Sequence, residues 1–100
     1  MNVTYFAFRG YDGPRSSELR SRVREQHRAY IREERYGCRV IAGGAIVDDD
    51  GRRMTGTLLI LEAPDRAAAL RFLAGDPYAC EGLFERTELD RWQWGLGQPS

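Results

Sequence analysis

The single histidine of this 100-residue chain is the first residue to consider for chemistry. His27 lies four residues after Val23 and four before Ile31, so on a helix it shares their apolar face. A neutral imidazole can take up or shuttle a proton near neutral pH. A histidine on an apolar face can equally be a buried structural residue whose hydrogen bonds are satisfied. The sequence alone permits both interpretations.

Two arginines precede His27 on the same predicted helix. Arg20 and Arg24 lie seven and three positions before it, so all three side chains project along one side. A guanidinium binds carboxylates and phenolates through a planar fork of N–H donors. We therefore predict that Arg24 and Arg20 bind an anionic substrate beside the imidazole. The alternative is that they form a solvated edge of the helix.

The segment Asp76-Pro77-Tyr78 is the second candidate for chemistry. Asp followed by Pro is typical of a helix start, with Asp76 as the N-cap and Pro77 in the first turn. A carboxylate in that place can also accept a hydrogen bond from an imidazole N–H and so fix the tautomer of the ring. We predict that His27 and Asp76 form an acid/base pair and that Tyr78 lines the same pocket. The alternative for Asp76 is a helix cap alone.

The composition argues against several classes of function. All fifteen basic residues are Arg, so lysine Schiff-base and P-loop chemistry are absent. Fifteen acidic residues balance them, which disfavours nucleic acid as a partner. Cys38 and Cys80 are too few for a metal cluster or a disulfide scaffold, and they are expected to be free thiols in the cytoplasm. We expect no metal, no cofactor, no signal peptide and no membrane partner.

Hydrophobic periodicity predicts two helices. Apolar residues spaced along one face favour a helix of about twenty residues that starts at Ser16 or Ser17 and ends at Gly37. Pro64-Asp65 is predicted to start a second helix over 66–74, which Gly75 ends. The residues of the second helix expected to face inward are Ala69, Leu70 and Leu73.

Four β-rich segments complete the pattern, and they are 3–8, 38–47, 54–63 and 83–94. The middle two are predicted to form a hairpin around an Asp-Gly turn. Gly43-Gly44 within one of them indicates a bulge or a close approach by another group.

The resulting order, βαββαβ, predicts an α+β ferredoxin-like plait, an antiparallel sheet with both helices on one face. We expect a single domain over 1–100, with its core at 3–94 and a tail at 95–100. The second face of so apolar a sheet would be bare, so we predict a homodimer through this open face, which would form a barrel-like core.

The chain resembles the YciI (YCII-related) family through an ordered set of residues. They are Arg20, Arg24, His27 and Tyr30, then Gly37 and Gly43-Gly44, and finally Asp76-Pro77-Tyr78, Gly82-Leu83-Phe84 and Trp92. The resemblance implies a dimeric α+β barrel of the ferredoxin-like type, with an active site formed by His27 and Asp76. A related dehydrochlorinase that acts on a chlorinated hydroquinone implies that the scaffold can support elimination. This chain departs from the family at Ala45, where Pro is frequent, and at Glu81, where Ala is frequent.

Together these residues predict an enzyme that needs no cofactor and acts on a small, anionic cyclic or phenolic substrate. Neutral His27 would move a proton, Asp76 would orient it and Arg24 would hold the anion, giving elimination, isomerisation or tautomerisation. The alternative is a non-catalytic dimeric module that binds a small ligand or acts as an accessory subunit, with His27 structural. A third possibility, haem binding, would require His27 as the axial ligand.

Overall fold

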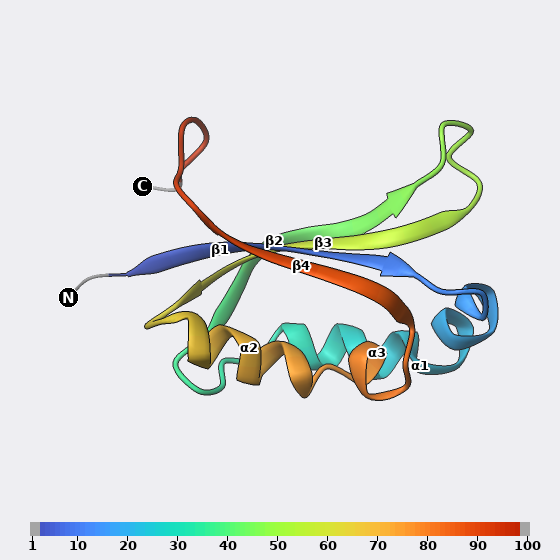
Figure 1. Ribbon diagram of the computed structural model, residues 1–100, viewed down its shortest axis with the longest axis horizontal. Coiled ribbons are helices and arrows are strands. Elements are labelled where there is room, and N and C mark those ends of the chain that lie inside the picture. Colours follow the sequence, from blue (N-terminus) through green and yellow to red (C-terminus); the bar gives the residue numbers. More distant parts are fainter. Residues whose placement is uncertain (1–2, 99–100) are drawn as a thin grey trace.

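The computed structural model describes residues 3–98 as a four-stranded antiparallel sheet with helices on one face (Figure 1). Its elements in chain order are β1 (Thr4–Asp12), α1 (Ser16–Ile31), β2 (Arg39–Val47), β3 (Met54–Ala63), α2 (Arg66–Ala74), α3 (Pro77–Cys80) and β4 (Phe84–Trp92). The strand order β2-β3-β1-β4 confirms the predicted ferredoxin-like plait. Residues 1–2 and 99–100 of the predicted domain and tail lie outside the described residues. None of the described helices combines the length and apolarity needed to cross a membrane.

The core lies between the sheet and the helices. Alternate residues of β1 and β3 point toward α2, and Phe6, Phe8, Leu59 and Leu61 are each at most 5% exposed. Phe72 of α2 is fully buried against them.

The predicted inner face of α2 is wrong at one position. Leu70 is 52% exposed, whereas Ala69, Phe72 and Leu73 are buried. These three residues stand at i, i+3 and i+4, which is one stripe of a helix, and Leu70 lies one residue off that stripe.

Strand β1 continues four residues past its predicted end at Phe8. Gly10 and Tyr11, which lie beyond the predicted segment 3–8, pair with both β3 and β4. A Cβ atom at Gly10 would stand 2.5 Å from the ring of Phe84, so glycine here makes room for that aromatic side chain. The glycine at this position therefore reflects close packing within the sheet.

Helix α1 is shorter than predicted and lacks the predicted serine cap. It ends at Ile31, and Gly37 lies beyond it in a loop where Tyr36 and Gly37 both have positive φ angles, of 58° and 74°. The N-cap is Arg15, with no side-chain capping bond. The hydroxyl of Ser16 instead donates to the carboxylate of Asp12 at the end of β1.

The predicted hairpin of β2 and β3 is confirmed. Its loop is closed by Asp48, whose carboxylate accepts the backbone N–H groups of Arg52 and Arg53. The expected close approach also occurs, because a Cβ atom at Gly43 would stand 2.6 Å from Cδ2 of Leu59. The pairing is irregular at two places, between Val40 and Ala42 just before the glycines and between Ile46 and Val47.

The sheet face opposite the helices is uncovered in this chain (Figure 1), and it has two unlike halves. The β2–β3 half is apolar, with Ala42, Ile46, Leu58 and Ile60 on its surface. The prediction of an apolar open face is therefore right for this half.

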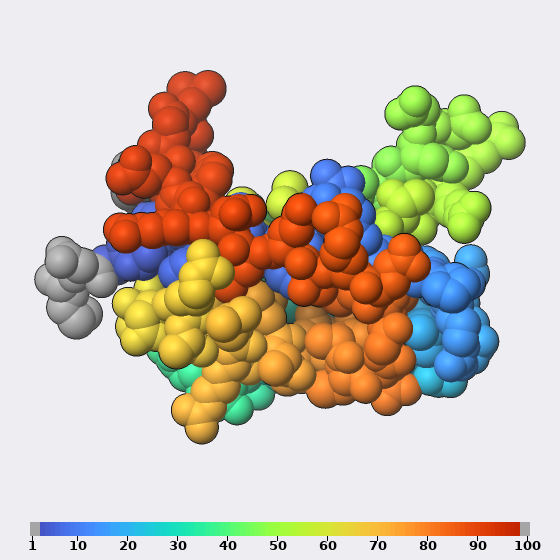
Figure 2. Space-filling model, in the orientation of Figure 1, coloured from blue at the N-terminus to red at the C-terminus, as the bar shows by residue number. Residues whose placement is uncertain are grey.

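The β1–β4 half of the open face is polar. The hydroxyl of Tyr11 donates to Glu88 at 2.8 Å, and the guanidinium of Arg86 lies 3.8 Å from the centroid of the Tyr11 ring. The prediction of an apolar face is wrong here because charged side chains of two neighbouring strands pair across the ladder. The β2–β3 loop and the segment after β4 project beyond this face and leave a hollow between them (Figure 2).

Candidate active site

Asp76 starts the short helix α3, as its Asp-Pro pattern predicts. Its Oδ1 accepts the backbone N–H of Tyr78 at 3.0 Å, and Pro77 occupies the first turn. The residue is only 2% exposed. A carboxylate buried this deeply requires further hydrogen-bonding partners.

His27 supplies such a partner from the buried face of α1. Its Nδ1 lies 2.8 Å from Oδ1 and 2.9 Å from Oδ2 of Asp76, although the two residues are 49 positions apart. The imidazole also stacks on the ring of Tyr78, with centroids 4.0 Å apart and planes 16° from parallel. The structure therefore brings together three of the five residues predicted for the site, His27, Asp76 and Tyr78.

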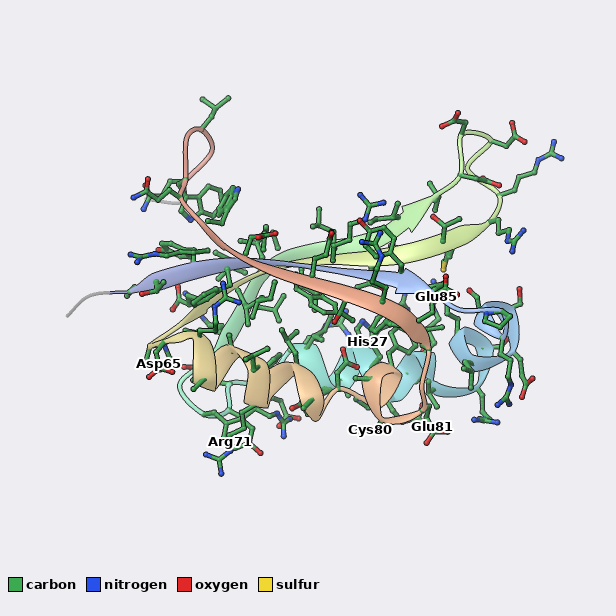
Figure 3. The ribbon with its side chains drawn as sticks, in the orientation of Figure 1. His27, Asp65, Arg71, Cys80, Glu81 and Glu85 are labelled. Atoms are coloured by element: carbon green, nitrogen blue, oxygen red, sulfur yellow. The ribbon has the colours of Figure 1, made fainter. Side chains whose placement is uncertain are left out.

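The contact with Asp76 determines what the imidazole can do. An ionised carboxylate only accepts hydrogen bonds, so Nδ1 carries the proton and Nε2 keeps a free lone pair when the ring is neutral. The ring lines a cavity of about 260 Å³ between α1 and the edge strand β2. Figure 3 shows His27 in the layer between the helices and the sheet. The pair thus has the geometry of a base and its orienting group.

Arg20 is buried in the wall of the cavity, and other residues already bind most of its donors. Its Nε and Nη2 form a two-point ion pair with Asp12 at 2.7 and 2.9 Å. Nη2 also donates to the Gly56 carbonyl and the Thr57 hydroxyl, both at 2.8 Å. Burial on its own would lower the pKa of Arg20, but the hydrogen bonds and charge of Asp12 outweigh it and raise the pKa. These contacts fit a structural role better than the predicted binding of substrate.

Arg24 lies one turn after Arg20 on α1, and its surroundings differ from those of Arg20. Its side chain lines the same cavity and is exposed. Within residues 3–98 it forms no hydrogen bond or ion pair. It is the predicted arginine that remains available to bind an anion.

Two further arginines of the cavity were not predicted. Arg28 and Arg32 follow Arg24 at intervals of four residues, and both line the cavity. Because residues four apart lie on one face of a helix, this repeat could have been found in the sequence. Among the described residues, no carboxylate lines the cavity.

Tyr78 forms the aromatic side of the site. Burial raises the pKa of its phenol, and the nearby guanidinium of Arg20, 5.1 Å from the ring centroid, opposes this shift only in part. The phenol is therefore neutral at physiological pH.

The remaining nucleophilic and acidic candidates lie outside the cavity. Cys38 is fully buried in the core, and burial raises the pKa of its thiol. Cys80 and Glu81 lie on the outer side of the helices (Figure 3), where Glu81 pairs with Arg22 at 2.7 Å. Over residues 3–98, no three His, Cys, Asp or Glu side chains gather in a way that could hold a metal ion.

The chain matches a known protein family over most of its length. Residues 4–93, nearly the whole described structure, match the YCII-related domain. The chain belongs to the YCII-related family. The resemblance carried by the motif residues of this YCII-related protein is thereby confirmed.

This YCII-related chain is also similar to proteins of known structure. It is similar to 5-chloro-2-hydroxyhydroquinone dehydrochlorinase from Burkholderia phenoliruptrix, solved in complex with 2,5-dihydroxybenzoquinone, at a TM-score of 0.78 and 29% identity. The match covers 91% of this chain and 95% of the other. SnoaB, a cofactor-independent oxygenase from Streptomyces nogalater, matches over 100% of both chains at a TM-score of 0.56 and 16% identity, which shows a shared fold. No curated protein sequence matches this chain.

Proposed function

We propose that this protein is an enzyme that works without a cofactor and uses His27 to move a proton on a small anionic phenolic or quinonoid ring. The observation that carries the proposal is the contact of Nδ1 with buried Asp76, at 2.8 Å, in an imidazole that lines an arginine-rich cavity. The similar dehydrochlorinase acts on a hydroxyhydroquinone and was solved with a quinone, which supports a ring of this class.

The proposed reaction starts with transfer of a proton from the substrate to Nε2 of His27. Asp76 then faces an imidazolium, whose positive charge its carboxylate stabilises. The electron pair left on the substrate moves into the ring. It either expels an anionic leaving group, which is elimination, or is reprotonated by His27 at another atom, which is isomerisation or tautomerisation. Arg24 stabilises the negative charge in both cases.

The first test compares chloride release from 5-chloro-2-hydroxyhydroquinone by the wild type and His27→Gln. We expect the variant to be about 10²–10⁴-fold slower, because glutamine can occupy the space but cannot take the proton. Arg22→Gln, on the outer side of the same helix, is the control and should react at the wild-type rate. Equal rates for the wild type and His27→Gln would refute the proposal.

A non-catalytic binding module is the second candidate, because a buried, stacked and hydrogen-bonded histidine also fits a structural role. The two functions differ in what His27→Gln loses. If His27 is structural, His27→Gln should lower the free energy of unfolding and leave ring binding in place. If His27 is catalytic, His27→Gln should slow turnover by about 10²–10⁴-fold while the urea midpoint stays close to that of the wild type.

The role of Asp76 can be tested directly because the chain has one imidazole. We expect the wild type to hold the Nδ1–H tautomer, which long-range ¹H–¹⁵N NMR correlations identify. In Asp76→Asn the side-chain amide can donate to Nδ1 and favour the Nε2–H tautomer, which is no longer a base at the cavity. An unchanged tautomer with full activity in Asp76→Asn would remove Asp76 from the mechanism.

We also propose that two copies associate through the apolar β2–β3 half of the open face. Leu58 is 42% exposed there, beside Ile60 and Ile46. Exposed apolar surface of this kind favours association. Sedimentation of the wild type and of Ile60→Glu measures it. A monomeric wild type would refute this part of the proposal.

A further inference from the structure

A row of three arginines on α1 and its C-cap lines the cavity, and the proposed reaction uses only the first of them. Arg24, Arg28 and Arg32 all line the cavity on the side of His27. The reaction proposed above needs one cation to hold one anionic group, and Arg24 meets that need. Two arginines therefore remain without a role.

Contacts within the protein do not explain the row. Arg24 has no partner within residues 3–98, and Arg28 approaches the highly exposed Glu25 only to 3.8 Å. Arg32 donates to the backbone oxygen of Arg28 at 3.4 Å, the long end of the hydrogen-bonding range. Like charges at four-residue spacing repel on a helix, so the row destabilises α1 in isolation.

The helix dipole accounts for only part of the arrangement. Cations in the last turn of a helix interact favourably with its C-terminus, which applies to Arg28 and, as the C-cap residue, to Arg32. The dipole effect falls off within that turn, so it does not reach Arg24. It also does not require that all three side chains border the same cavity.

The size of the row indicates more than one anionic group. Arg32 lies eight positions after Arg24, which is about 12 Å at the helical rise of about 1.5 Å per residue. One carboxylate or phenolate can pair with one end of such a row. Two anionic groups on one ring can occupy both ends while the ring itself remains beside His27.

We infer that the substrate is a dianionic ring compound, with one anionic group at Arg24 beside His27 and a second, a carboxylate, held by Arg28 and Arg32. This inference rests on the proposed function, since it places the reacting ring at His27. It adds Arg28 and Arg32 as residues that determine specificity for the second charge.

Three probes that differ by one carboxylate at each step test the inference. They are hydroquinone, 2,5-dihydroxybenzoate and 2,5-dihydroxyterephthalate. Calorimetry at fixed ionic strength should show that the wild type binds the dicarboxylate at least about tenfold more tightly than the monocarboxylate, as expected for one added charge-assisted contact. Arg28→Gln/Arg32→Gln should remove that preference and leave affinity for the monocarboxylate within about twofold.

The control is Arg22→Gln, which removes the same charge from the outer side of α1, where Arg22 pairs with Glu18 and Glu81. It should keep the preference for the dicarboxylate. The ring protons of His27 report in every titration whether the bound ring reaches the imidazole.

The outcomes separate the inference from the proposed function. If the monocarboxylate shifts the His27 signals but the dicarboxylate binds no more tightly than the monocarboxylate, the inference is overturned and the proposed function stands. The same conclusion follows if Arg28→Gln/Arg32→Gln and Arg22→Gln prefer the dicarboxylate to the same extent. If the dicarboxylate binds through Arg28 and Arg32 without shifting the His27 signals, the row is a separate anion site and the inference is also overturned. If no probe binds, the inference and the proposed substrate class both fail.

Discussion

Two buried carboxylates each bind a side chain of α1, and they differ in what they leave free. Asp12 binds Arg20 at two points, and the guanidinium continues to Gly56 and Thr57. Asp76 binds one nitrogen of His27, and the other nitrogen has no partner among the described residues. The first cluster is closed by its own contacts, whereas the second has an open position at the cavity.

The partners also differ in charge. A guanidinium is charged at every physiological pH, so the Arg20–Asp12 pair can only hold elements together. An imidazole changes its charge near neutrality, so the His27–Asp76 pair can exchange a proton. Arg20 and His27, seven positions apart on one helix, thus differ because the described residues bind most N–H groups of Arg20 but only one nitrogen of His27.

The largest effect is expected when the closed cluster is broken. Arg20→Gln should lower the free energy of unfolding by about 3–5 kcal/mol, because it leaves the carboxylate of Asp12 buried without a counter-charge. Urea unfolding measures this loss. The same substitution at His27 should cost clearly less, since Asp76 keeps the N–H of Tyr78. Equal costs at the two positions would contradict the distinction between the clusters.

A smaller effect is expected at Gly43 in the cavity wall. Gly43→Ala should destabilise the protein by about 1–3 kcal/mol, because its Cβ would stand 2.6 Å from Cδ2 of Leu59 and 3.0 Å from the carbonyl oxygen of Leu58. Gly44→Ala is the matched control, since nothing lies within 4 Å of its Cβ position. Thermal unfolding of both variants tests the prediction, and similar losses would refute it.

The smallest effect concerns alkaline pH and Tyr78, which touches both clusters. Because burial raises its pKa above the ordinary 10.0, the unfolded chain loses this proton first. Stability from this group is complete below pH 10.0 and is lost as pH rises toward the folded pKa. Tyr30 contributes in the same direction, and Cys38 does so from its ordinary value of 9.0.

Tyr78→Phe removes one of these groups. The free energy of unfolding should then fall less steeply above pH 10.0, by at most about 1.4 kcal/mol per pH unit. Urea midpoints measured below and above that pH check the slope. A steeper fall in the variant would show that the phenol is ionised in the folded state.

Local patterns in the sequence were sufficient for the parts of the site that are local in structure. Asp76 as a helix cap depends on residues within two positions, and the sequence predicts it correctly. The element order and the plait follow from hydrophobic periods and from the rules for connecting strands.

Long-range partners could not be predicted in the same way. Arg20 was predicted to bind substrate because it shares one side of the helix with His27. Its contact with Asp12 could not be predicted, because it depends on β1 extending beyond the predicted end of that strand. The end of α1 was predicted too late, at Gly37. Gly37 has a positive φ, as a residue that ends a helix often does, but it lies in the loop closed by the bridge between Arg35 and Cys38. A turn residue can be recognised from sequence, whereas its distance from the helix end depends on tertiary contacts.

Hydrogen bonds near both ends of α1 affect its amide hydrogen exchange. Arg20 ties its second turn to β1 and β3, and the hydroxyl of Tyr30 ties its last turn to the backbone of α2 through Phe72, at 2.7 Å. His27 lies between these two points, so fraying from either end of the helix does not reach it. Its amide exchanges only through openings that also separate the helix from the sheet. The imidazole is accordingly held in place before any ligand arrives.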